Sequence, residues 1–171
     1  MRETIIGLFS AKMALLNSGL IPKDACACVI LTKRQGFIMQ LRDNLDNIFF
    51  PGRWGFFGGA TEPNETWKET IVREIYEELS IKFPADRFQS CGEIILKTEN
   101  LKLVRKFFIL NISSLETDSI KLTEGQSWKE FSKNEVKDLN LTPYDEYFFH
   151  IICDQIGSEI INYPEHFKGS N

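Results

Sequence analysis

The sequence predicts an α/β fold in which a mixed β-sheet is covered by helices on both faces. Apolar runs rich in β-branched residues recur along the chain with the length of strands. A capped amphipathic helix interrupts them at residues 66–79, and a last helix follows Pro143. Because strands and helices are interspersed without strict alternation, a mixed sheet is expected rather than a fully parallel one.

The chain length predicts one compact domain with short extensions. The 171 residues are 43% hydrophobic and 26% charged, which is typical of a folded globular protein. We expect an N-terminal helical arm at residues 1–24, the domain at residues 25–157 and a C-terminal tail at residues 158–171.

The first half of the domain predicts three strands and the main helix. Residues 25–32 and 37–42 are apolar runs separated by Gly36, residues 43–52 form a turn-rich loop, and residues 54–57 form a short buried strand. Thr66 and Glu69 have the spacing of a capping box at the start of the helix. One side of that helix is apolar and packs, with Ile71, Val72, Ile75 and Leu79.

The second half predicts a long hairpin, two short strands and two helices. Residues 88–97 and 101–112 read as a hairpin that turns at residues 99–100, followed by short strands at residues 120–122 and 128–131. Ser132 and Glu135 repeat the capping-box spacing and predict a short helix. The last helix, residues 144–156, is expected to pack through Tyr147, Phe148, Ile151 and Ile152.

Charge and cysteine content exclude several classes of function. The net charge of −4 argues against a polymeric nucleic acid as partner. The four cysteines lack CxxC spacing, which argues against a zinc site, and Cys26 and Cys28 are expected on one face of a strand as small buried residues, with a redox role as the alternative. This cysteine usage suits a reducing cytoplasm.

A membrane anchor is not expected. No apolar run reaches the ~18 residues that a membrane-spanning helix needs. Residues 1–19 carry Arg2, Glu3 and Lys12 among short apolar runs, so they are interpreted as an amphipathic arm, with a signal peptide as the alternative.

The helix at residues 66–79 carries an unusual group of carboxylates. Glu74, Glu77 and Glu78 lie on the arc next to the apolar face. On an exposed surface such like charges cost only a few tenths of a kcal/mol, roughly, which is the alternative reading. In a cleft with an effective dielectric near ~20, each close pair costs about 3 kcal/mol, so the group would need a cation.

The spacing around this group decides between the two readings. From Gly59 to Ile81 the chain follows Gx5Ex7REUxEExGU, where U is a bulky aliphatic residue, and departs from it only at Ser80. This segment resembles the Nudix box, and the order of strands and helices resembles the α/β/α sandwich with a mixed β-sheet of the Nudix fold. Ser80 falls where a left-handed helix cap is expected, which affects stability rather than chemistry.

The resemblance implies a metal site and its ligands. Magnesium, or manganese in its place, would be held by oxygen ligands. The implied metal ligands are the backbone carbonyl of Gly58 with Glu74, Glu77, Glu78 and Glu124, of which Glu77, Glu78 and Glu124 are also the expected catalytic residues. Glu124 is chosen because of its context, Thr123-Glu124-Gly125-Gln126, with a plain turn residue as the alternative and Glu93 in reserve.

Supporting and substrate-binding residues follow from the same resemblance. Gly59 lets the backbone approach metal and phosphate, while Arg73 and Glu65 form a pair that orients a carboxylate of the box. Arg42 is expected on substrate phosphate, with a solvated arginine as the alternative. Asp145, or its neighbour at the start of the last helix, is expected to reach the edge of a purine.

The implied activity is hydrolysis of a nucleoside diphosphate linked to another group, by attack of a metal-activated water on phosphorus. Subgroup markers of ADP-ribose, dinucleoside polyphosphate and coenzyme A cleavage are not recognised outside the box, which favours a nucleoside triphosphate cleaved to the monophosphate and pyrophosphate. The alternatives are a nucleotide sugar or other diphosphate derivative as substrate, or a non-catalytic nucleotide-binding module. The expected partner is a small nucleotide, and a homodimer is the favoured assembly.

Overall fold

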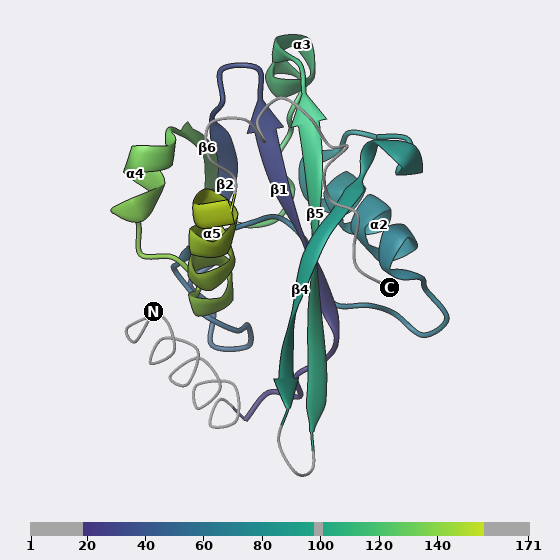
Figure 1. Ribbon diagram of the computed structural model, residues 1–171. Helices are drawn as coiled ribbons and strands as arrows, with labels where there is room; N and C mark the ends of the chain where they lie inside the picture. Colours follow the sequence, from purple (N-terminus) through teal and green to yellow (C-terminus); the bar gives the residue numbers. More distant parts are fainter. Residues whose placement is uncertain (1–18, 98–100, 156–171) are drawn as a thin grey trace.

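A computed structural model describes residues 19–97 and 101–155, which form a six-stranded sheet with helices on both faces (Figure 1). The strand order is β3-β2-β1-β5-β4, and β6 pairs with β2. The strands are β1 (Ala25–Thr32), β2 (Phe37–Leu41), β3 (Trp54–Gly55), β4 (Gln89–Lys97), β5 (Lys102–Ile112) and β6 (Ser127–Phe131). The helices are α2 (Trp67–Leu79), η1 (Ala85–Arg87), α3 (Ser114–Asp118), α4 (Lys133–Lys137) and α5 (Pro143–Gln155).

The sheet is mixed, as predicted. Strands β1 and β5 are parallel, with Ala25 opposite Arg105, whereas β1–β2, β2–β3, β2–β6 and β4–β5 are antiparallel. The predicted hairpin is present as the pair β4–β5, and its turn at residues 99–100 lies outside the described residues.

Strand β1 builds a core on each face of the sheet because its side chains alternate. Cys26, Cys28 and Ile30 point to one face and pack with Ile71, Ile75 and Leu79 of α2. The opposite face carries Ala27, Val29 and Leu31, which pack with residues of α5. The predicted burial of the two cysteines on one face is confirmed, and helix α2 is thereby held against the sheet.

Helix α2 begins and ends as the sequence predicts. The Thr66 hydroxyl accepts a hydrogen bond from the backbone N–H of Glu69, whose carboxylate accepts from the N–H of Thr66, so the capping box is complete. Ser80 ends the helix with φ 57° and ψ 24°, the left-handed conformation expected there. The second predicted box, at Ser132 and Glu135, opens α4.

The prediction of a strand at residues 120–122 is wrong. The chain instead forms helix α3, opened by a capping box of Ser113 and Glu116, and then runs along the end of α2. The N–H groups of Lys121 and Thr123 donate to the carbonyls of Leu79 and Glu78 at 3.1 and 3.0 Å. These carbonyls at the helix end need partners, and they engage the N–H groups that a strand would have used.

Two other predictions need correction. Helix α5 packs through Phe148 and Ile152, as predicted, and also through Tyr144 and Phe149, while Tyr147 packs against the same core half-buried and Ile151 is half-buried. The expected strand at residues 54–57 is shorter, because only Trp54 and Gly55 pair regularly and Phe57 makes an isolated bridge to Cys28.

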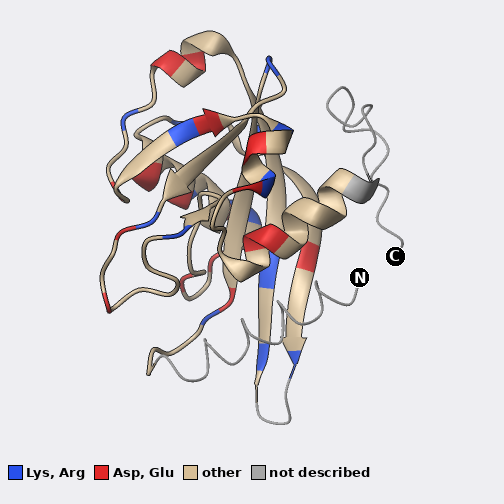
Figure 2. Ribbon diagram, turned by 90° about the vertical axis from the view of Figure 1, so that its left-hand side faces the viewer, with Lys and Arg blue, Asp and Glu red and all other residues tan. Residues whose placement is uncertain are grey.

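The predicted N-terminal arm and C-terminal tail lie largely outside the described residues. Residues 1–18 of the expected arm and residues 158–171 of the expected tail lie outside the described residues, and residues 19–24 are irregular chain leading into β1. No helix within the described residues has the length and apolar character needed to cross a membrane. Over the described ribbon, acidic and basic positions are interspersed rather than gathered in one basic face (Figure 2).

Candidate active site

The loop at residues 56–60 lies against the start of β1 and brings backbone close to backbone. The N–H groups of Cys26 and Cys28 donate to the carbonyls of Gly59 and Phe57 at 2.9 and 2.8 Å. Gly58 has φ 130°, and a Cβ at this position would lie 2.4 Å from the carbonyl oxygen of Cys26. Only glycine fits there, so the loop can follow the sheet closely.

Glu78 is the buried carboxylate of the site. It lies on α2 with 5% of its surface exposed. Its two oxygens accept hydrogen bonds from the backbone N–H of Gly58 at 2.7 Å and from the side-chain amide of Gln40 at 2.8 Å. Burial raises the pKa of Glu78 to about 8, against the opposing effect of these two donors.

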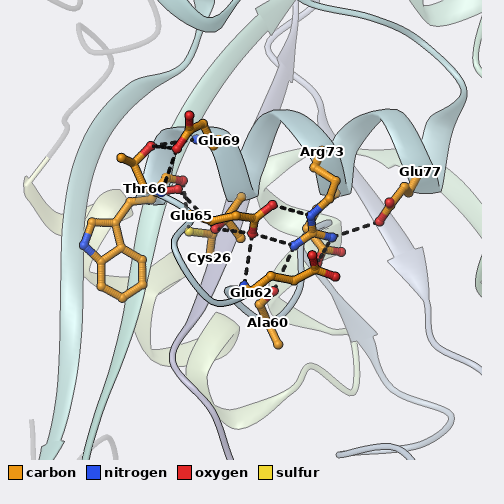
Figure 3. Close-up of polar contacts among 11 residues, drawn as sticks. Cys26, Ala60, Glu62, Glu65, Thr66, Glu69, Arg73 and Glu77 are labelled. Atoms are coloured by element: carbon orange, nitrogen blue, oxygen red, sulfur yellow. Dashed lines mark hydrogen bonds and ion pairs between the residues drawn. The ribbon is translucent and has the colours of Figure 1, made fainter.

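Arg73 is the hub of the polar contacts on the loop side of α2 (Figure 3). Its guanidinium donates to both oxygens of Glu65, at 2.6 and 2.9 Å, which is a bidentate pair. It also donates to Glu74 at 2.8 Å, to Glu77 at 2.9 Å and to the carbonyl of Ala60 at 3.0 Å. The predicted pair of Arg73 and Glu65 is therefore present, and Arg73 contacts two carboxylates of the box.

Glu74 and Gly59 are in close contact. A Cβ at Gly59 would lie 2.4 Å from a carboxylate oxygen of Glu74, so glycine leaves the room that this carboxylate occupies. Burial raises the pKa of Glu74, partly offset by its hydrogen bond and ion pair with Arg73. The side chain of Glu77, in contrast, is 47% exposed and pairs with Arg73.

Glu124 lies in the turn between α3 and β6, where the chain runs along the end of α2. Thr123 anchors this turn by its N–H bond to the carbonyl of Glu78 and by its hydroxyl, which donates to the carbonyl of Glu77. On the other side the N–H of Gly125 donates to Asp43 at 3.3 Å. The Glu124 side chain is exposed, and its charge contributes to the raised pKa of both Glu74 and Glu78. The structure therefore brings Glu124 into the electrostatic environment of the box.

The donor set fits a hard divalent cation in its chemistry. It consists of carboxylate oxygens, which magnesium and manganese prefer, and it includes a buried carboxylate, Glu78, whose hydrogen-bond donors are both neutral. In the arrangement described, Glu74 and Glu77 face Arg73, and no three His, Cys, Asp or Glu side chains of the described residues are placed to share one ion. Each of these two carboxylates uses one oxygen for its contact with Arg73.

A cavity of about 340 Å³ opens beside the loop at residues 58–60. Arg42 lines it and is half-buried, with its Nε donating to the carbonyl of Phe49 at 3.0 Å, so it is not the fully solvated arginine considered as the alternative. Asp145 does not line this cavity: it is 1% exposed and pairs with Arg105 at 2.9 Å. Its contact with a purine edge stays a prediction.

Sequence reasoning missed three residues of this region. Gln40 binds Glu78, and Arg105 and Tyr144 line the cavity. Gln40 interrupts an otherwise apolar strand, which was a usable signal, because a polar residue on a buried face needs a partner. Arg105 stands next to Lys106 in a strand that carries several polar residues, so it gave no such signal. Tyr144 had no such signal, since aromatic residues are common on the apolar side of a helix.

Comparison with known proteins agrees with this geometry. A family model described as NUDIX domain matches residues 22–151. Two relatives are named nucleoside triphosphatase NudI: that of Enterobacter sp. (strain 638) is 53% identical over 34 residues, and that of Klebsiella pneumoniae (strain 342) is 38% identical over 52 residues. These matches cover 20% and 30% of this chain and only 24% and 37% of the relatives.

The fold is shared with solved structures at low sequence identity. The MutT protein from Methanosarcina mazei Go1 is 19% identical with a TM-score of 0.62, over 79% of this chain and 96% of that chain. This likeness shows the fold alone, whereas the family model matches the sequence over most of its length. The protein therefore belongs to the Nudix hydrolase family.

Proposed function

We propose that this protein is a magnesium-dependent pyrophosphohydrolase that cleaves a nucleoside triphosphate to the monophosphate and pyrophosphate. The observation that carries the proposal is the buried Glu78 carboxylate, which has two neutral donors, lies beside the glycine loop and is influenced by the charges of Glu74 and Glu124. A buried carboxylate next to further carboxylates is stabilised when a cation joins them.

Each residue of the box has a part that its contacts support. Glu74, Glu77, Glu78, Glu124 and the carbonyl of Gly58 would hold the metal. When bound, magnesium supplies charge neutralisation on the phosphoryl oxygens and lowers the pKa of a coordinated water. Gln40 and the N–H of Gly58 hold the Glu78 carboxylate in one orientation.

Other residues position the substrate and take up the proton. Arg73, which is fixed by Glu65, pairs with Glu74 and Glu77 and keeps these two carboxylates near the loop. Arg42, at the end of β2 in the cavity wall, would bind a substrate phosphate. Glu124 and Glu77 are exposed carboxylates, and either would accept the proton of the attacking water.

The choice of a nucleoside triphosphate rests on two supports. Subgroup markers for other substrates are not recognised in the sequence, and the two partial relatives are named nucleoside triphosphatases. A nucleotide sugar or another nucleoside diphosphate derivative is the alternative substrate, and a non-catalytic nucleotide-binding module is the alternative class. We also propose that the protein forms a homodimer and is located in the cytoplasm.

The test is a substrate screen with identified products. Triphosphates, dinucleotides and nucleotide sugars would be incubated with magnesium or manganese, and monophosphate and pyrophosphate would be quantified. Glu77→Gln should lower the rate by orders of magnitude with an unchanged melting temperature, while Glu146→Gln, an exposed glutamate on α5, should match the parent protein. Absence of turnover with every substrate and both metals would favour the binding module.

A further inference from the structure

The cavity beside the glycine loop is lined by cations and hydrogen-bond donors. Of the residues that the structure describes, its lining includes Lys23, Arg42 and Arg105 and no Asp or Glu. Burial and the nearby charge of Arg105 both lower the pKa of Arg42, so the two guanidinium groups influence each other. A ligand that fills this space must therefore offer acceptors.

Two buried donor groups on residues that line the cavity have no partner among the described residues. The Tyr144 side chain is 5% exposed, and its hydroxyl makes no hydrogen bond there. The Nε of Arg105 is likewise buried and without a partner. Buried polar atoms are nearly always hydrogen-bonded in folded proteins, so an orphaned pair at one cavity indicates a partner that arrives with a ligand.

Asp145 holds Arg105 in place without satisfying it. One oxygen of Asp145 accepts from Nη2 of Arg105 at 2.9 Å. The other accepts from the N–H of Phe56 at 3.1 Å and from the hydroxyl of Thr142 at 2.8 Å. Because Asp145 is anchored on three sides, the guanidinium is fixed while its buried Nε–H has no hydrogen-bond acceptor among the described residues.

An aromatic wall stands next to these donors. Phe50 has φ 55°, which is unfavourable for a bulky residue, and its ring meets the ring of Tyr144 edge to face with centroids 5.9 Å apart. The bond from Arg42 Nε to the carbonyl of Phe49 holds this part of the loop. Strained backbone of this kind is found where a surrounding structure fixes a side chain for use.

We propose that Tyr144 and Arg105 are specificity-determining residues that donate hydrogen bonds to a carbonyl oxygen of the substrate's nucleobase. The inference rests on the proposed function, since the base would enter the cavity while the phosphates lie at the glycine loop. Apolar walls favour a base over a further phosphate, because a phosphate there would lose hydration against Ile21, Pro22, Phe49, Phe50, Leu96 and Leu103. Arginine has no acceptor, so an exocyclic amine in place of the carbonyl is disfavoured.

Paired substrates that differ in one carbonyl test this inference. Inosine triphosphate would be compared with purine riboside triphosphate, which lacks the carbonyl, and uridine triphosphate with its 4-deoxy analogue. We expect kcat/KM to favour the carbonyl-bearing member of the better-used pair by about tenfold. Tyr144→Phe, which removes only an orphaned hydroxyl, should bring this ratio toward one without lowering the melting temperature.

Two further variants test the role of Arg105 and provide a control for Tyr144→Phe. Arg105→Lys keeps a cation for Asp145 but removes the Nε–H, so it should also reduce the ratio. Tyr147→Phe makes the same chemical change on the same helix at a residue that does not line the cavity, and it should leave the ratio as in the parent protein. The inference would be overturned if the parent protein showed a kcat/KM ratio near one, or if Tyr144→Phe kept the ratio of the parent. Turnover of the triphosphates would still support the proposed function in either case.

A binding measurement separates the two claims when turnover is absent. Calorimetric titration with the α,β-methylene analogues of the same triphosphates, in the presence of magnesium, reports base preference without cleavage. A preference for the carbonyl that Tyr144→Phe abolishes would support the inference even if the protein does not hydrolyse triphosphates. Equal affinities within both pairs, or no binding of any analogue, would overturn it.

Discussion

The side-chain amide of Gln40 donates a 2.8 Å hydrogen bond to the carboxylate of Glu78 and so joins the end of β2 to the last turn of α2. Both residues are buried, with 3% and 5% of their surfaces exposed. The amide of Gln40 also lies 3.5 Å from the carbonyl of Phe56, at the start of the glycine loop. One neutral side chain thus connects the sheet, the helix and the loop that form the candidate site.

Replacing Gln40 should impair both stability and activity. Gln40→Leu leaves one oxygen of the buried Glu78 carboxylate without its donor, which we expect to cost about 1–3 kcal/mol in free energy of unfolding. The same change should lower kcat, because Glu78 loses its fixed orientation. Urea denaturation and steady-state kinetics measure the two effects. Gln89→Leu, on the half-buried start of β4, is the control, and equal effects of both variants would contradict the role of Gln40.

The two glycines of the loop should respond differently to alanine. In Gly59→Ala the new Cβ meets only the end of the Glu74 side chain, at 2.4 Å, so this carboxylate must move. In Gly58→Ala the Cβ meets the backbone carbonyl of Cys26 at 2.4 Å and the backbone itself must move. We expect Gly59→Ala to lose activity with a small change in melting temperature, and Gly58→Ala to lose both. Thermal unfolding and product release distinguish them, and a strong loss of stability in Gly59→Ala alone would refute this assignment.

Stability should depend on the ionisation of Glu116, which lies away from the candidate site. Its hydrogen bonds with Arg87, and then with Ser113, lower the pKa of Glu116 to about 2 from 4.5. A carboxylate whose pKa is lower in the folded state stabilises fully above the unfolded pKa, and this contribution is lost as pH falls from 4.5 toward 2.

Urea midpoints measured between neutral and strongly acidic pH check this dependence. Glu116→Gln should be less stable than the parent protein near neutral pH, and the gap should narrow as the pH falls through that interval. Glu146→Gln serves as the control because Glu146 is exposed on α5. A gap that stays constant with pH would show that Glu116 does not contribute through its charge.

Replacing Ser80, at the end of α2, by glycine should stabilise the fold. Ser80 holds φ 57°, a conformation that costs a side-chain residue more than it costs glycine, so Ser80→Gly should raise the free energy of unfolding by about 1 kcal/mol. Ser119 ends α3 with φ −89°, and Ser119→Gly should be neutral or destabilising. The denaturation midpoints of the two variants provide the test, and a parallel shift would contradict the explanation by backbone conformation.

Local chemistry allowed helix α2, its caps and most of the strands to be predicted from the sequence. Thr66 and Glu69 are three residues apart and satisfy each other, and Ser80 stands where the helix must turn left-handed, so neighbours in sequence contain the information. The alternation along residues 25–32 likewise assigned Cys26 and Cys28 to one face before any partner was known. The box carboxylates follow, because helical spacing places them on one arc.

Tertiary structure decided how distant segments meet at the site. The path of residues 120–125 along the end of α2, the bond between Gln40 and Glu78, and the anchoring of Arg105 by Asp145 join residues that are 38 or more positions apart. Such contacts depend on which groups are buried together and which donors remain unsatisfied after packing. For that reason the sequence by itself identified the carboxylates of the box, while the donors of the adjoining cavity emerged only from the fold.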